Sequence, residues 1–231
     1  RPSYEDAGIA RDQTDFIFAC FNRNLKIKPD IFEVWMRILK AVPRSVLWLR
    51  RFHIRVQENL LKHAERMGVS NSSIIFAGRI PQRSKHLARH QLADLFLDTP
   101  RFGGHSTLAD VYWAGVPALV IPGEGVSSRI GASMASAFNG SVFIARNLQD
   151  YHEMAVQLAS KRGERTIEMW KKQEAPTIHD DGGRVGSQQY TMGLERMYQS
   201  MWEEFRTRRH HKQRTGRTSR PFVLSIAAHQ P

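Results

Sequence analysis

Residues 93–133 read ADLFLDTPRFGGHSTLADVYWAGVPALVIPGEGVSSRIGAS, and this stretch decides the fold. Its apolar run ends at Asp98 and gives way to a turn with Pro and Gly, after which a helical pattern begins at Ser106 or Thr107. This order predicts a strand, a short loop and a helix N-terminus. Gly103 and Gly104 permit a sharp turn and the close approach of a ligand. The free amides and the dipole of the helix then favour an anion.

The same residues also have a purely structural interpretation. Thr107 and Asp110 are spaced like a capping box, with Asp in place of the usual Glu or Gln, so they could simply start a helix. The local pattern alone leaves the two interpretations open. A second Gly-x-Gly lies within residues 123–129, but it lacks a third glycine and is more typical of a turn than of an NAD site.

Short apolar runs alternate with amphipathic segments on both sides of this stretch. Strands that are apolar on both faces indicate a parallel sheet covered by helices on each side. We therefore predict an α/β fold with a doubly wound, mostly parallel six-stranded sheet, which is one Rossmann-like lobe. Two longer helices are expected at 164–172 and 189–206. The six predicted strands are 16–20, 45–49, 74–77, 95–98, 118–121 and 142–145.

Candidate ligand-binding residues follow three of these strands. Lys26 comes after the first, His86 and Arg89 come after the third, and residues 105–110 come after the fourth. Ligands of such sheets bind outside the carboxyl ends of the strands. This coincidence predicts one binding site, although each residue also has an ordinary interpretation. Lys26 could be a solvated loop lysine beside Lys28, and the helix that carries His86 and Arg89 could be a polar surface.

The composition indicates a globular protein. The chain has 231 residues, of which 41% are hydrophobic, and its one cysteine excludes an internal disulfide framework and a cysteine-based zinc site. No apolar run of about 18 residues occurs, and the first 15 residues do not resemble a signal peptide. We expect a reducing compartment, the cytoplasm or the nucleus. Because the chain starts at Arg1 without Met, we expect it to be an excerpt.

The positive charge is concentrated at the C-terminus. Seven Lys and Arg residues and no acidic residue lie in 206–231, which leaves a net charge of +5 for residues 1–205 out of +12 for the chain. Such a tail could contact nucleic acid or anionic lipid. It holds no recognisable binding module and only one aromatic residue, so a solvated extension is favoured. If the tail binds nucleic acid, deletion of 207–231 should abolish that binding.

Several short sequence segments resemble the C-terminal catalytic lobe of O-GlcNAc transferase. They cover most of residues 16–205 in the family's order. The resemblance implies a GT-B glycosyltransferase that transfers N-acetylglucosamine from UDP-GlcNAc to Ser and Thr hydroxyls of proteins, with inversion at the sugar carbon. The segments are FNRNLKIKP at 21–29, PRSVLWLRRF at 43–52, GHST at 104–107, Asp110, WAGVP at 113–117, PGE at 122–124, IARNLQDYHEMAVQLA at 144–159 and, more weakly, QYTMGLERMYQSMW at 189–202.

The resemblance also implies roles for individual residues. Lys26 corresponds to the lysine that contacts the diphosphate and is needed for transfer. His86 and Arg89 would hold the uracil, and Asp110 would accept hydrogen bonds from the ribose. Arg23 stands where the family usually has Gln, which adds a phosphate contact or alters the sugar pocket.

The loop after the fourth strand corresponds to the family's His-Thr-Thr element. His105, Ser106 and Thr107 occupy its three positions, and Ser106 departs from the pattern but keeps the hydroxyl. We expect these hydroxyls and amides to contact phosphate. No cofactor and no metal are then needed, because Lys26 and the helix amides can stabilise the diphosphate.

Other parts of the family enzyme do not match this chain. The resemblance implies a second lobe and helical repeats as partners, which supply a histidine near the acceptor and most of the protein-substrate groove. The chain is therefore expected to be inactive without them. We divide it into a linker or the end of an upstream lobe at 1–15, a UDP-sugar-binding lobe at 16–163, C-terminal helices at 164–206 and a basic tail at 207–231.

Two further interpretations remain within this fold class. A protein O-fucosyltransferase of the same superfamily shares the lysine region, but its loop after the fourth strand lacks the histidine, so His105 argues against it. A nucleotide-binding module without catalysis is compatible with Arg23 and with the missing lobe.

Overall fold

The computed structural model describes residues 3–178 and 187–215. The chain divides into two units after residue 179, and each unit is treated by itself. Five strands in the first unit form one sheet in which every pairing is parallel. The strand order is β3-β2-β1-β4-β5. The strands are β1 (Phe16–Cys20), β2 (Ser45–Arg50), β3 (Ile74–Ala77), β4 (Leu95–Leu97) and β5 (Ala118–Leu119).

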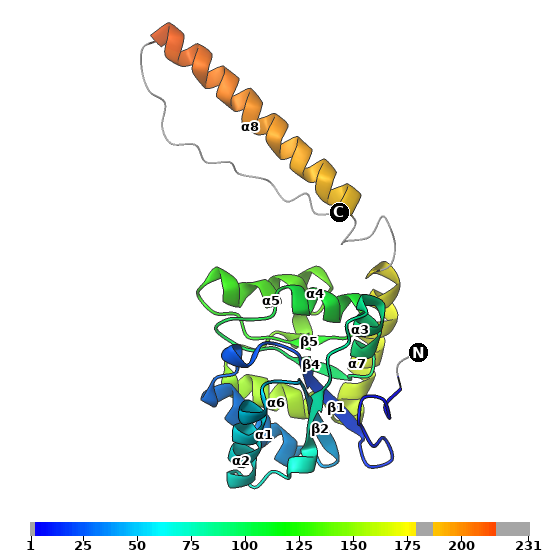
Figure 1. The fold of residues 1–231 in the computed structure, drawn as a ribbon. Helices are drawn as coiled ribbons and strands as arrows, with labels where there is room; N and C mark the ends of the chain where they lie inside the picture. The colour runs from blue at the N-terminus through cyan, green and yellow to red at the C-terminus, as the bar shows by residue number, and fades with distance from the viewer. Residues whose placement is uncertain (1–2, 179–186, 216–231) are drawn as a thin grey trace. The chain divides into compact units, whose positions relative to one another are not determined.

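Helices cover both faces of the sheet. Figure 1 shows α1, α2 and α6 on one side and α3, α4 and α5 on the other, and α1 contacts α6 while α4 contacts α3, α5 and α7. The doubly wound parallel fold predicted from the sequence is confirmed. The helices of this unit are α1 (Pro29–Ala41), α2 (Ile54–Arg66), α3 (Arg83–His90), α4 (Ser106–Trp113), α5 (Val126–Ala137), α6 (Leu148–Leu158) and α7 (Lys161–Ile178), with 3-10 turns η1 (Asn24–Lys26), η2 (Asn71–Ser73) and η3 (Ser141–Phe143).

The central strand explains why the sheet forms. All five residues of β1 are buried, and the strand lies between β2 and β4. A strand with apolar side chains on both faces is stable only where helices cover both faces. The strand order reverses at β1, because β2 lies on one side of it and β4 on the other. In open α/β sheets the crevice at such a reversal is the usual ligand site.

The sixth predicted strand, 142–145, does not form as a strand. Residues 141–143 form the turn η3, and a single parallel bridge joins Val120 to Ile144. Pro122 follows this bridge closely and has no amide N–H to donate, so the ladder cannot extend. The sheet therefore has five strands and one isolated bridge where six strands were predicted.

The C-terminal part of the first unit also differs in detail from the predicted pattern. Helix α6 ends at Leu158 and α7 runs from Lys161 to Ile178, so α7 is longer at both ends than the predicted 164–172. The Ser160 hydroxyl accepts the Gly163 amide, as a residue that caps a new helix does. Trp170 of α7 is buried and donates a hydrogen bond to the Phe138 carbonyl at 2.8 Å. Helix α7 is thus part of the core of the first unit.

The second unit contains α8 (Ser187–Thr215), which is longer than the predicted 189–206. It carries exposed apolar side chains, among them Tyr198, Trp202 and Phe205. Residues 216–231, which make up most of the predicted basic tail, lie outside the described residues. Among the helices that the structure describes, we find none with enough length and apolar character to cross a bilayer.

Trp170→Ala is expected to lower the free energy of unfolding by about 3–5 kcal/mol, because it removes a buried indole and leaves a cavity. The indole packs edge-on against Phe143, with ring centroids 5.8 Å apart. Urea denaturation followed by circular dichroism measures the loss. Met169→Ala is the matched control, since that neighbouring side chain is 61% exposed and its loss should change stability by less than about 0.5 kcal/mol. Equal losses in both variants would contradict the packing of α7 described above.

Candidate functional site

A buried carboxylate fixes the ends of the two central strands. Asp98 follows β4, and its Oδ1 accepts hydrogen bonds from the Gly104 amide at 2.7 Å and from Asn22 Nδ2 at 2.8 Å. Asn22 follows β1, and its Nδ2 also donates to Thr99 Oγ1 at 2.9 Å. The Thr99 hydroxyl in turn donates to the Phe102 carbonyl at 3.0 Å. These bonds set the path of the loop between β4 and α4.

The two glycines of this loop are explained by the same carboxylate. A Cβ atom at Gly103 would lie 2.6 Å from Asp98 Oδ2, and one at Gly104 would lie 2.9 Å from Asn22 Oδ1. Any other residue would have to displace these buried polar groups. The sequence suggested that the glycines admit a ligand, whereas in the structure the side chains of Asp98 and Asn22 already make the close approach.

Lys26 reaches the same loop from η1. Its Nζ donates to the Gly103 carbonyl at 2.7 Å and lies 4.4 Å from the centroid of the Phe102 ring. Burial lowers the pKa of Lys26, and the nearby Asp98 carboxylate opposes this effect. A lysine in this position offers further N–H donors to an anion at the tip of the loop.

His105 lies directly before α4. Its ring stacks on Phe102, with centroids 5.2 Å apart and an interplanar angle of 18°. Its Nε2 is 3.2 Å from the Ser127 carbonyl oxygen. Ser106 and Thr107 open the helix; Ser106 is exposed and Thr107 is half-buried. Lys26 from η1 and the loop before α4 therefore bring together a cation, an imidazole and the amides of a helix N-terminus.

A cleft of about 470 Å³ lies beside this loop, at the carboxyl ends of β1, β2 and β3. The predicted residues His86, Arg89, Thr107 and Asp110 all line it. Arg89 is buried, donates to the Gly78 carbonyl at 2.7 Å and lies 4.7 Å from the centroid of the Phe21 ring. It is therefore held as part of the wall. The remaining lining residues are Phe21, Arg50, Arg51, Ala77, Gly78, Arg79 and Ile80.

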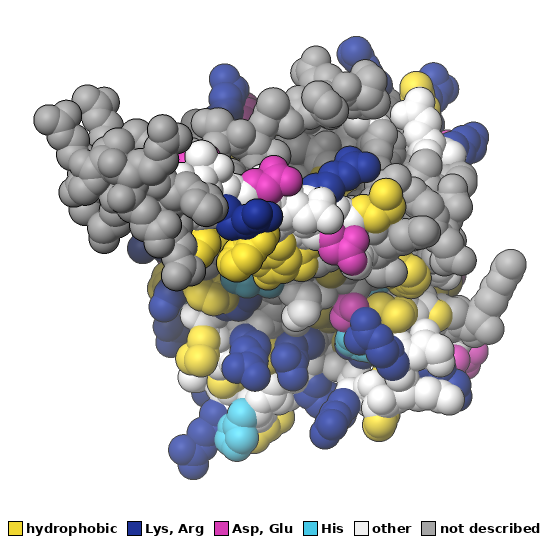
Figure 2. All heavy atoms as spheres, turned by 90° about the horizontal axis from the view of Figure 1, so that it is seen from above, with side chains coloured by type: hydrophobic (Ala, Val, Ile, Leu, Met, Phe, Trp, Pro, Cys, Tyr) yellow, Lys and Arg dark blue, Asp and Glu magenta, His cyan; other side chains and the backbone are white. Residues whose placement is uncertain are grey.

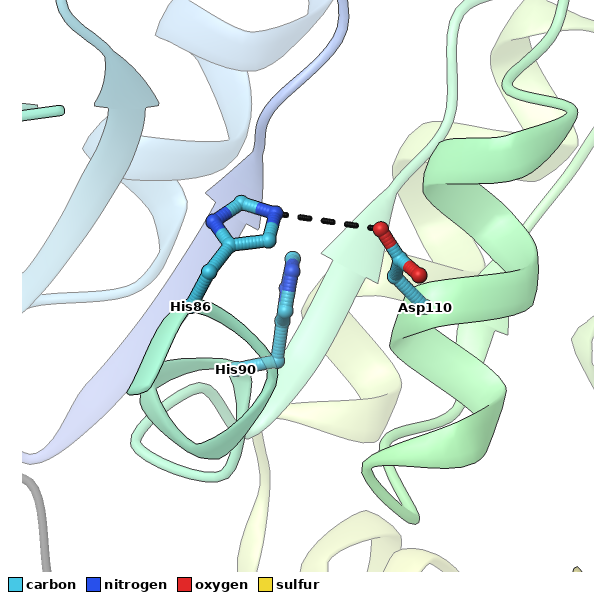
Figure 3. A group of neighbouring side chains, drawn as sticks. All are labelled: His86, His90 and Asp110. Atoms are coloured by element: carbon cyan, nitrogen blue, oxygen red, sulfur yellow. Dashed lines mark ion pairs between the residues drawn. The ribbon is translucent and has the colours of Figure 1, made fainter. Parts of the chain in front are cut away.

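Asp110 is the acidic residue in this cleft lining. Its Oδ1 is 3.3 Å from Arg83 NH2, and its Oδ2 is 3.7 Å from His86 Nε2. Burial and the positive charge of Arg89 lower the pKa of His86, and Asp110 opposes them. Figure 3 shows His86 and Asp110 facing each other from two helices, with His90 beside them. Within residues 3–178 and 187–215, these three side chains form a group able to hold a metal ion.

Basic side chains surround the cleft. Arg50, Arg51 and Arg79 line it beside Arg89, and they come from the ends of β2 and β3. Figure 2 shows Lys and Arg side chains at many points on one face of the molecule, with smaller areas of Asp and Glu. Such a cleft favours an anionic ligand over a neutral one.

The structure places the predicted site residues in two neighbouring groups. His86, Arg89, Thr107 and Asp110 share the cleft. Lys26 and His105 both contact Phe102 in the adjoining loop. Arg23 and Ser106 are exposed, and neither lines the cleft. Their roles remain predictions.

Sequence reasoning missed several residues of this region. Asn22 and Asp98 are polar and buried directly after apolar strands, and this pattern was a usable signal. Arg50 and Arg79 lie at strand ends, as the chosen candidates do. His90 is one helical turn from His86, and this spacing could have identified the pair.

Comparison with known proteins identifies relatives over most of the chain. A model of the family "Glycosyl transferase family 41" matches residues 8–181. The chain is 36% identical over 208 residues to the Arabidopsis thaliana protein described as probable UDP-N-acetylglucosamine–peptide N-acetylglucosaminyltransferase SEC, covering 87% of this chain and 20% of that protein. It is 32% identical to the UDP-N-acetylglucosamine–peptide N-acetylglucosaminyltransferase of Caenorhabditis elegans, covering 82% and 16%. The chain thus spans a fifth or less of these relatives.

Solved structures share the fold. An O-GlcNAc transferase from Thermobaculum terrenum superposes with a TM-score of 0.73 at 24% identity, covering 82% of this chain and 36% of that one. The Anabaena protein HepE, solved with UDP and glucose, gives a TM-score of 0.55 at 15% identity, covering 84% and 53%. At these identities the likeness shows the fold alone.

Burial raises the pKa of Asp98 to about 6. A carboxyl whose pKa is higher in the folded state stabilises the fold most when protonated, so this contribution is lost as pH rises from about 4 to 6. Asp98→Asn should remove this dependence, worth about 2–3 kcal/mol because each pKa unit is worth about 1.4 kcal/mol. Urea denaturation of both proteins between pH 4 and pH 7 measures the difference in slope. If the free energy of unfolding changed with pH in the same way in both proteins, the raised pKa of Asp98 would be contradicted.

Proposed function

Since this chain belongs to glycosyl transferase family 41, we propose that it is the donor-binding half of an enzyme that transfers N-acetylglucosamine from UDP-GlcNAc to Ser and Thr hydroxyls of proteins. The observation that supports this most strongly is the placement of His86, Arg89, Thr107 and Asp110 in one cleft at the strand ends, next to Lys26. We propose that a nucleoside occupies this cleft with its diphosphate toward the loop.

In this proposal the nucleoside occupies the cleft between α3 and α4. The uracil lies against His86 and near Arg89, whose guanidinium is already fixed by the Gly78 carbonyl. Asp110 accepts hydrogen bonds from the ribose hydroxyls. To do so, its carboxylate gives up its ion pair with Arg83 in favour of the ribose. Arg83 NH2 lies 3.3 Å from Asp110 Oδ1, and the arginine side chain is 76% exposed. Such an exposed ion pair contributes little to stability, so the exchange costs little.

The diphosphate occupies the loop between β4 and α4. Lys26 exchanges the Gly103 carbonyl for phosphate oxygens, and the hydroxyls and amides at Ser106 and Thr107 donate to the same group. His105 precedes Ser106 in the sequence, and Arg23 lies three residues before Lys26. We include both among the residues proposed to contact the diphosphate. Charge-assisted hydrogen bonds of this kind are stronger than neutral ones.

The reaction of the whole enzyme follows from this placement. The acceptor hydroxyl attacks the anomeric carbon, the bond from that carbon to the phosphate oxygen breaks, and the configuration inverts. Negative charge develops on the departing UDP, where Lys26 and the helix amides stabilise it. We propose that transfer uses no metal. The proton of the hydroxyl passes to a group outside this chain, in the second lobe.

The proposal includes the partners and the compartment of the enzyme. A second lobe and helical repeats supply the acceptor groove, and the chain alone binds UDP weakly and transfers little. We place the enzyme in the cytoplasm or the nucleus. Cys20, the only cysteine, is buried in β1 and free, which suits a reducing compartment.

Lys26→Ala is expected to weaken UDP binding by about tenfold or more, because a hydrogen bond to a charged group is worth about 1.5–3 kcal/mol. Isothermal titration calorimetry with UDP measures the change. Lys28→Ala is the matched control, since this lysine is exposed two residues away and should keep its affinity within about twofold. Equal affinities for the two variants would remove Lys26 from the proposed site.

The chain is expected to bind UDP and UDP-GlcNAc at least about fivefold more tightly than GDP or GDP-fucose, because one or two base-specific hydrogen bonds are worth about 1 kcal/mol each. Calorimetry with the four ligands at one ionic strength tests this. A preference for the guanine nucleotides would support the O-fucosyltransferase alternative. Absence of binding by any nucleotide would refute the donor-binding proposal.

A further inference from the structure

We propose that His86, His90 and Asp110 form a binding site for a divalent transition metal ion of the zinc class, and that an ion bound there excludes the nucleoside from the cleft. The second part rests on the function proposed above, whereas the first stands on the geometry of the three side chains. The site would inhibit the enzyme and plays no part in the transfer step.

The first observation is an unsatisfied buried nitrogen. His90 is 1% exposed, and its Nε2 has no hydrogen-bond partner among the described residues. Its ring packs edge-on against Phe21, with centroids 5.0 Å apart. Buried polar atoms are nearly always hydrogen-bonded, because an unmet one costs about 1–3 kcal/mol. A nitrogen held in place without a partner is available to a ligand.

The second observation is the convergence of two further ligands on this ring. His86 and His90 are separated by one turn of α3, and their ring centroids are 5.1 Å apart. Asp110 approaches from α4, with Oδ2 3.7 Å from His86 Nε2. One ligand atom from each residue lies within 4.8 Å of the other two, as Figure 3 shows for the side chains.

These separations are close to those of a metal centre. Ligand atoms about 2.0–2.1 Å from a tetrahedral zinc ion lie about 3.3 Å from one another. His90 is fixed, but the side chains of His86 and Asp110 are 30% and 18% exposed and can close the remaining distance. Two imidazoles and one carboxylate are a donor set that zinc uses, and they leave a fourth position open.

Arginine side chains near the three proposed ligands oppose the binding of a cation but leave one carboxylate oxygen open. Arg83 pairs with Asp110 Oδ1, and Arg50 and Arg89 lie near His86, so a divalent cation is repelled. Arg83 leaves Oδ2 of Asp110 free to coordinate.

A bound ion would conflict with the nucleotide. His86 and Asp110 are the residues proposed to contact the base and the ribose, and both line the cleft. Once they coordinate an ion they cannot hold the nucleoside. Each ligand should therefore weaken the other by the same factor, because coupling between two binding events is reciprocal.

Titration of the full chain with Co²⁺ tests the metal site, because Co²⁺ replaces Zn²⁺ in such sites and absorbs visible light. The protein is prepared without a polyhistidine tag. We expect one Co²⁺ per chain, with the visible absorption of a four- or five-coordinate ion that added Zn²⁺ abolishes. His90→Phe should weaken binding more than about 100-fold, since even residues that only orient ligands are worth about 10–100-fold in metal affinity.

Two controls separate this site from other histidines. The double variant His210→Ala, His211→Ala removes an adjacent pair in the basic C-terminal part of the sequence and should leave the Co²⁺ spectrum unchanged. If His90→Phe fails to fold, Asp110→Asn provides the same test, because it keeps the shape of the side chain and removes the charge. Binding that survives His90→Phe and Asp110→Asn, or that disappears with the double variant, would overturn the site.

The second part is tested by titrating Zn²⁺ into the chain in the presence and absence of UDP. We expect saturating UDP to weaken Zn²⁺ binding at least about tenfold in the unchanged chain. Zn²⁺ should weaken UDP binding by the same factor there, but not in His90→Phe, which retains UDP binding without the metal site. Equal Zn²⁺ affinities with and without bound UDP would overturn the exclusion. If UDP does not bind at all while Co²⁺ binds through His90, the proposed function and the exclusion fail and the metal site stands.

Discussion

The buried carboxylate of Asp98 is the constraint on which the candidate site depends. It accepts the Gly104 amide and the Asn22 side chain, and so joins the ends of β1 and β4. Its own backbone carbonyl accepts the Tyr151 hydroxyl of α6 at 3.0 Å. A charged or polar group at this depth is tolerated only because these donors surround it. The position of the loop before α4 follows from this network.

The strand order explains why the loop and the cleft adjoin each other. The chain leaves β1 in one direction toward β2 and β3 and returns on the other side at β4. The helices that begin after β3 and β4 therefore flank a crevice, which is lined by His86 of α3 and Asp110 of α4. Lys26 and the loop after β4 meet at the same point of the sheet. A diphosphate and a nucleoside would occupy adjoining parts of one crevice.

Much of the site could be predicted because strand ends are readable from sequence. His86, Arg89, Thr107 and Asp110 follow apolar runs, and parallel strands bring such positions to one edge. The prediction of a sixth strand at 142–145 was wrong, because the effect of Pro122 on pairing depends on which segment lies beside it. His90 was not found, because its spacing of one helical turn from His86 gives no sign that its ring is buried against Phe21. Asp98 was treated as the end of a strand although it organises the loop.

The sequence by itself determined the alternation of strands and helices and the parallel sheet, because these depend on the period and the length of apolar runs. It also predicted the edge of the sheet at which the candidate site lies. It also determined the concentration of charge at the C-terminus. Only the tertiary structure decided that Gly103 and Gly104 approach a carboxylate, that Lys26 rests on Phe102 and that the buried Nε2 of His90 has no hydrogen-bond partner among the described residues. Such features depend on distances between residues far apart in the chain, and local pattern carries no information about those distances.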